Sequence, residues 1–158
     1  MIDYHVHTSL CNHATGTMEQ YVRAAVGKEL ATICFLDHLT FQAAGRANAM
    51  FSREGPMYVN AARRLAQHFR ARISVRVGLE IDFSPRQVDR CIEIVDTFDL
   101  DVVGGGVHFL DGDGVVSQRS AWARGELSPD GVYPKYLGVL ESMLDYDRFD
   151  VICHLDLP

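Results

Sequence analysis

Five short strand-like segments alternate with helical patterns in this chain, and each of the five ends in a histidine or a carboxylate. The strand-like segments are residues 1–7, 31–36, 73–79, 100–107 and 150–153. This alternation predicts parallel strands joined by right-handed helical crossovers. A β/α barrel builds its active site at the carboxyl ends of its strands, whereas an open doubly wound sheet binds its ligand in one crevice. Ligand-type residues at every strand end therefore favour the barrel.

The segments between the strands contain signals for helix starts. Thr17 and Gln20 form a capping box, and Ser84 with Pro85 predicts a second start, with serine as N-cap and proline as the first helical residue. We expect four helices, over 18–30, 56–69, 84–95 and 132–146, and two long loops, over 39–55 and 111–131.

Histidines are concentrated at the start of the chain. His5 and His7 would lie on one face of a strand, and His13 follows closely. Two neutral imidazoles on one rigid element are a good start to a transition-metal site. The later strand ends add further candidates, and Asp82 and Asp156 are expected to lie near them without binding metal. The later candidate ligands are His38, Glu80, His108 and His154.

Composition narrows the classes of function. A length of 158 residues suits one domain, 1–158, and a net charge of −6 argues against a nucleic-acid partner. The four cysteines form no CxxC pair, and no apolar run reaches membrane-spanning length. We therefore expect a cytoplasmic protein with no membrane partner. Clustered divalent metals without another nucleophile motif favour hydrolysis of phosphoryl or acyl groups.

The ordered motifs resemble one family. Asp3-x-His5-x-His7 with His13, Asp37-His38, Gly78-Leu79-Glu80, Val107-His108-Phe109 and His154 are similar to the PHP (polymerase and histidinol phosphatase) family, and most similar to its histidinol-phosphatase branch. The resemblance spans essentially the whole chain. It implies an α/β fold, a distorted (β/α)7 TIM-like barrel. This chain would supply about the first five β/α units, as a single PHP metal-hydrolase domain.

The resemblance also implies a site for up to three divalent ions, which would be zinc, manganese or iron. It places His5, His7 and Glu80 on the first ion. Glu80 would bridge to a second ion held by His108 and His154, and the third would be held by His13 and His38. Glu80 and His108 would act in catalysis with a metal-bridging hydroxide that attacks phosphorus. Independently, Arg119 follows His108 in a polar loop and is a candidate for binding the substrate phosphate.

The expected activity is hydrolysis of a small phosphate monoester, which by resemblance is L-histidinol phosphate. Two alternatives remain: a phosphoesterase for another small phosphate such as a nucleotide, and a non-catalytic, metal-binding structural remnant. The family's late Asp-x-His motif has no counterpart before Pro158. Five parallel strands also leave two open sheet edges. We therefore expect a truncated domain whose edges are covered by a missing C-terminal segment or by a second copy in a homo-oligomer.

Overall fold

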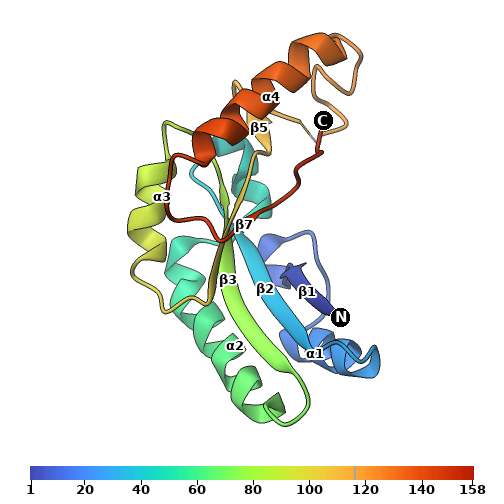
Figure 1. Ribbon diagram of the computed structural model, residues 1–158, viewed down its shortest axis with the longest axis vertical. Coiled ribbons are helices and arrows are strands. Elements are labelled where there is room, and N and C mark those ends of the chain that lie inside the picture. The colour runs from blue at the N-terminus through green and yellow to red at the C-terminus, as the bar shows by residue number, and fades with distance from the viewer. Residues whose placement is uncertain (116) are drawn as a thin grey trace.

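The computed structural model describes residues 1–115 and 117–158, and its main feature is a curled parallel sheet (Figure 1). In the described residues the sheet has the order β1-β2-β3-β4-β7, and all four pairings are parallel. The prediction of consecutive parallel strands is confirmed. The strands are β1 (Ile2–Val6), β2 (Thr32–Leu39), β3 (Ser74–Asp82), β4 (Val102–Gly106) and β7 (Val151–Ile152).

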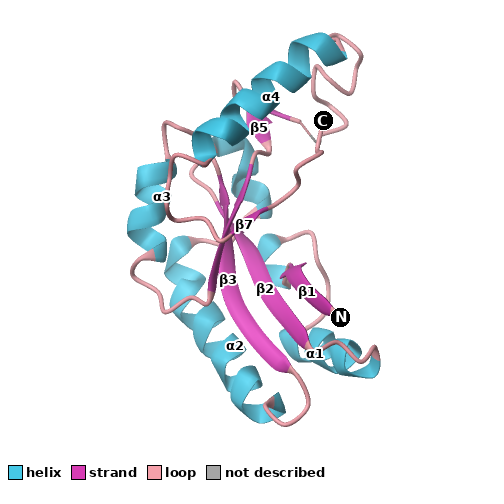
Figure 2. Cartoon of the chain, in the orientation of Figure 1, coloured by secondary structure: helices cyan, strands magenta, loops and turns pink. Residues whose placement is uncertain are grey.

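Helices cover the outer face of this sheet (Figure 2). The two longest strands, β2 and β3, have α1 and α2 beside them, whereas α4 lies across the far end beside a short hairpin (Figure 1). No helix of the described residues is long and apolar enough to cross a membrane. The helices are α1 (Met18–Gly27), α2 (Gly55–Phe69), α3 (Val88–Val95) and α4 (Pro129–Met143), and the hairpin pairs β5 (Phe109–Leu110) with β6 (Asp113–Gly114).

The two faces of the sheet differ in what they bury. Ile33 and Phe35 of β2 pack into the larger core cluster together with apolar residues of α1 and α2. Cys34 and Leu36 alternate with them and belong to a separate small cluster on the inward face. Because side chains alternate along a strand, His38 of β2 shares the inward face with Leu36. The helices therefore cover one face, and the other is left for the candidate ligands.

Local predictions are confirmed at the first helix and wrong at the third. The side chain of Thr17 accepts from Gln20 N, and the Gln20 side chain accepts from Thr17 N, as a capping box requires. Ser84 is not the N-cap of α3. Its backbone carbonyl accepts from the amides of Gln87 and Val88, both at 2.9 Å, so residues 84–87 form a turn and the helix begins at Val88.

The predicted loops and the third strand also differ in extent. Strand β3 continues to Asp82 because it pairs with β2 and β4 on both sides, so Glu80 lies inside the strand. The region predicted as a loop over 39–55 contains two 3-10 turns, η2 (Ala43–Asn48) and η3 (Ser52–Glu54). The loop over 111–131 contains β6 and the start of α4, and its residue 116 lies outside the described residues.

Curvature brings the two sheet edges to the same place. Strands β1 and β7 are the edges, yet the rings of His5 and His154 have centroids 4.6 Å apart. Glycine makes close packing possible on the inward face. A Cβ added to Gly106 would lie 2.6 Å from Glu80 Oε1 and 2.9 Å from His108 Cε1. As predicted, β1 and β7 each pair on one side only among the described residues, and what covers these edges stays a prediction.

Gly106→Ala is expected to lower the free energy of unfolding by about 1–3 kcal/mol, because buried neighbours must move to admit the methyl group. Gly138 on α4 is the matched control, since a Cβ there has nothing within 4 Å. Gly138→Ala is expected to stabilise the protein by up to about 1 kcal/mol, because alanine is the better helix former. Urea unfolding measures both variants, and equal stabilities would contradict the close packing at Gly106.

Candidate metal centre

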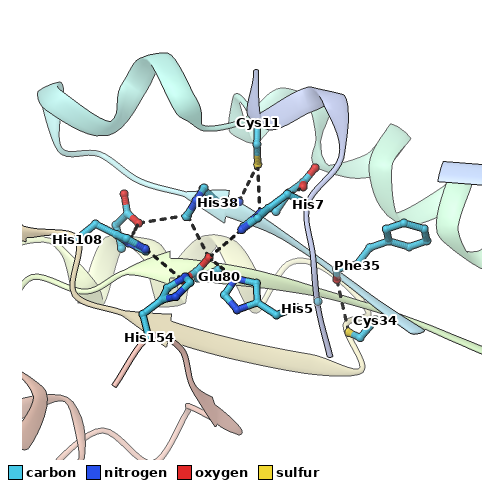
Figure 3. A network of polar contacts seen from close by, with 12 residues as sticks. His5, His7, Cys11, Cys34, Phe35, His38, Glu80, His108 and His154 are labelled. Atoms are coloured by element: carbon cyan, nitrogen blue, oxygen red, sulfur yellow. Dashed lines mark hydrogen bonds and ion pairs between the residues drawn. The ribbon is translucent and has the colours of Figure 1, made fainter. Parts of the chain in front are cut away.

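The buried carboxylate of Glu80 lies at the centre of the imidazole cluster on the inward face (Figure 3). Glu80 comes from β3, the middle strand, and its side chain has no exposed surface. Its Oε2 atom faces three imidazoles. The distances are 3.0 Å to His5 Nε2, 3.2 Å to His38 Nδ1 and 3.7 Å to His7 Nε2. Imidazoles from β1 and its end and from β2 therefore converge on one carboxylate oxygen of β3.

The other oxygen of Glu80 faces two further imidazoles. Oε1 lies 3.5 Å from His108 Nε2 and 3.5 Å from His154 Nε2. These two histidines follow β4 and β7, so all five strands of the sheet contribute to the cluster. One carboxylate thus has imidazoles on both oxygens, which is the geometry that a bridging ligand between two ions requires.

Two buried atoms in this cluster lack hydrogen-bond partners among the described residues. They are Glu80 Oε1 and His38 Nδ1. Buried polar atoms in folded proteins almost always have partners, so such atoms call for an explanation. Both are electron-pair donors of the kind that zinc and similar divalent ions bind. The donor set therefore fits divalent metal ions.

His13 joins the cluster through a short turn after β1. The 3-10 turn η1 (Ser9–Cys11) begins where the Thr8 side chain accepts from Leu10 N, and it ends at Asn12 in a left-handed conformation with φ of 58°. The His13 ring then has its centroid 4.8 Å from that of His7 and 5.3 Å from that of His38. The structure therefore brings together six of the seven histidines.

Burial keeps several of these imidazoles neutral. It is the main cause that lowers the pKa of His7 to about 3, with the charge of His38 acting in the same direction. Burial also lowers the pKa values of His13 and His154. Only the neutral form of an imidazole has a free electron pair for a metal. The seventh histidine, His68, lies on α2, outside the cluster, with its ring beside that of Phe69.

Asp82 orients one of the candidate ligands. Its Oδ1 atom lies 2.7 Å from His108 Nδ1, and the same oxygen is 3.4 Å from His38 Nδ1. Burial opposes the charge on Asp82, but the hydrogen bond to His108 and the proximity of His38 hold its pKa well below the usual range. Burial likewise opposes the charge on His108, and the bond to Asp82 raises its pKa. With Nδ1 held by a carboxylate, His108 presents Nε2 to Glu80.

Asp37 holds the turn that delivers His13. Its Oδ1 accepts from Thr8 N at 2.5 Å, and its Oδ2 accepts from the Thr8 hydroxyl. The carboxylate is fully buried, and burial raises its pKa. Asp37 therefore supports the segment between β1 and η1. Its Oδ1 atom also lies 3.8 Å from His7 Nδ1.

Cys11 is a neighbour of the site that the motifs did not single out. Its Sγ accepts from His38 N at 3.1 Å and lies 3.9 Å from His7 Nδ1. Together with His7 and His13 it forms one of the groups whose ligand atoms all lie within 4.8 Å of one another. The sequence signal that could have identified Cys11 is its place two residues before His13, in the same connection between the first strand and the first helix.

Five of the six clustered imidazoles, all but that of His5, line a pocket of about 400 Å³. Its other walls include Gly45, Asn48, Phe109 and Leu157. A larger pocket of about 920 Å³ shares the Phe109 side chain. Arg119 is exposed, and the described residues that line these two pockets do not include it. Its role in phosphate binding stays a prediction.

Comparisons with known proteins agree on one family. The PHP domain model matches residues 3–158. The chain is 35% identical over 162 residues to a Deinococcus radiodurans protein named "Probable histidinol-phosphatase", covering 100% of this chain and 61% of that protein. It is 30% identical over 120 residues to the histidinol-phosphatase of Bacillus subtilis, covering 70% and 45%. The chain thus spans about half to three-fifths of the length of these relatives.

A solved structure has the same fold. The crystal structure of histidinol phosphate phosphatase from Lactococcus lactis, complexed with zinc, L-histidinol and phosphate, superimposes with a TM-score of 0.83. The match covers 98% of this chain and 57% of that one, at 22% sequence identity. The partial TIM-like barrel predicted from the strand pattern is therefore confirmed.

Glu80→Gln tests whether one carboxylate serves two ions. Glutamine keeps the shape but loses the charge that faces imidazoles on both oxygens, so we expect the loss of two bound ions per chain relative to the parent protein. Elemental analysis after gel filtration measures this, with the exposed Glu126→Gln as control. Loss of a single ion would contradict the bridging role.

Asp82→Asn and Asp82→Ala separate an orienting residue from a metal ligand. Asparagine retains an oxygen that can accept from His108 Nδ1, so we expect it to bind metal nearly as well as aspartate. Alanine is expected to weaken binding by roughly 10–100-fold, as is typical when such partners are removed. Competition with a chromophoric chelator measures both, and exposed Asp156→Ala is the control. Equal losses in the two variants would indicate that Asp82 itself binds metal.

Proposed function

The chain belongs to the PHP domain family, and we propose that it is a metal-dependent phosphatase that hydrolyses L-histidinol phosphate to L-histidinol and phosphate. The observation that carries the proposal is the buried Glu80 carboxylate with imidazoles on both oxygens. The names of the relatives favour this monoester over other small phosphates. Five histidines lining one pocket favour a catalytic centre over a purely structural one.

We assign up to three divalent ions, zinc, manganese or iron, to this centre. His5, His7 and Glu80 would hold the first, and His108 and His154 would complete a second that shares Glu80. His13 and His38 would hold the third. Bound divalent ions supply Lewis acidity and lower the pKa of water toward neutrality, which is the chemistry that phosphate ester hydrolysis needs.

The chain's own residues prepare the centre for an anionic substrate. The first and second ions would share the charge of one bridging carboxylate, Glu80, while the other assigned ligands are imidazoles, and burial lowers the pKa of two of them, His7 and His154. Few negative charges therefore offset the ions, and a phosphate dianion is attracted to the pocket. His108 is held at Nδ1 by Asp82 and contributes its Nε2 edge without reorganisation during the reaction.

The pocket suits a small substrate. Its volume of about 400 Å³ lies in the range of small-molecule sites and is open at one side. Phe109 and Leu157 provide apolar surface next to the imidazoles, where the non-phosphate end of the substrate would lie. All four cysteines are free and buried, which is typical of a reducing compartment and supports our proposal that the enzyme acts in the cytoplasm.

Phosphate release from L-histidinol phosphate tests the proposal. We expect release that chelation abolishes and that added zinc, manganese or iron restores. His108→Ala should reduce it to background, because an ion loses its ligand, while His68→Ala is the matched control outside the cluster. Chelator-insensitive release would contradict the mechanism. Metal-dependent release from a nucleotide but not from L-histidinol phosphate would reassign the substrate, and metal binding without any release would favour a structural role.

A further inference from the structure

The structure assigns to Tyr136, a residue of α4 outside the metal centre, the role of a positioning residue for the His154 imidazole. Its hydroxyl donates a hydrogen bond to the backbone carbonyl of His154. The inference rests on the metal centre of the proposed function, but it does not depend on the identity of the substrate.

His154 is held by little regular structure. It follows β7, a two-residue edge strand that pairs only with β4 among the described residues. The backbone bond between these strands nearest to His154 runs from Cys153 N to Gly105 O, at 2.7 Å. A ligand at the end of so short a strand needs a further anchor to keep its ring in place.

The backbone of His154 also has a conformation that few residues adopt. Its φ is 54°, in the left-handed region, where a side chain crowds the neighbouring carbonyl. In this conformation Nε2 of the ring lies 3.5 Å from Glu80 Oε1, while the carbonyl accepts from Tyr136. The hydrogen bond therefore stabilises the same backbone conformation that aims the imidazole at Glu80.

Tyr136 is a rigid donor. It is fully buried in a cluster with Phe83, Val107 and Leu140, so its hydroxyl has a fixed position relative to β4 and its hairpin. Helix α4 contributes no residue to the imidazole cluster in the part of the chain that the structure describes. Through the Tyr136 hydroxyl, helix α4 thus fixes the position of the His154 backbone at the end of β7.

Tyr136→Phe removes only this hydroxyl and leaves the ring that packs in the core, so the variant is expected to fold. We expect the zinc ion that His154 would help to hold to bind roughly 10-fold less tightly, as for other residues that orient metal ligands. Competition with a chromophoric chelator measures the affinity, and the absorption spectrum of the cobalt-substituted protein reports the loss of an imidazole. Melting temperatures confirm that each variant is folded under the conditions used.

The matched control is Tyr133→Phe, one turn earlier on α4, whose hydroxyl donates to the Pro158 carbonyl instead. It should bind zinc like the parent protein. In a His154→Ala background, Tyr136→Phe should cause no further loss, because the ring that it positions is already gone. Unchanged affinity in Tyr136→Phe, or an equal loss in both backgrounds, would overturn the inference.

The test is separate from that of the substrate. Metal affinities that follow this pattern, in a protein that releases no phosphate from L-histidinol phosphate, would overturn the proposed function and still support the role of Tyr136. A parent protein that binds no divalent ion would overturn both.

Discussion

Glu80 is a charged group near the carboxyl end of β3, the middle strand of the sheet, and the rest of the site is arranged around it. A buried carboxylate is costly unless it is paired and hydrogen-bonded. Here burial opposes the charge, but the hydrogen bond to His5 and the nearby imidazoles lower the pKa of Glu80. The cluster of histidines and the buried charge therefore stabilise each other, and divalent ions would complete that arrangement.

This constraint shapes the sheet. Imidazoles can reach both oxygens of Glu80 only if the sheet curls enough to bring its two edge strands together over β3. Little room is then left for side chains beside the carboxylate, and Gly106 of β4 fits there because it has no side chain. A larger side chain at position 106 would push strand β4 away from the candidate ligands Glu80 and His108.

The ligands differ in how firmly the fold holds them. His38 lies within β2, a long strand paired on both sides, whereas His13 and His154 lie in turns at the ends of short elements. His13 and His154 have their own supports, since Asp37 binds the segment before His13 and Tyr136 binds the His154 carbonyl. Residues distant in sequence from these two histidines thereby support the backbone of the candidate ligands.

The sequence by itself determined the strand order, the partial barrel and the identity of the clustered histidines, because two-residue alternation and strand ends are local features. The extent of β3 depended on pairing with strands distant in sequence, and the start of α3 depended on a turn closed by the Ser84 carbonyl, so the capping and strand signals misplaced both. Only the tertiary structure decided that both oxygens of Glu80 face imidazoles, that Asp82 orients His108, and that Cys11 and Tyr136 contact the ligands. These contacts depend on sheet curvature and side-chain orientation, which arise from long-range packing.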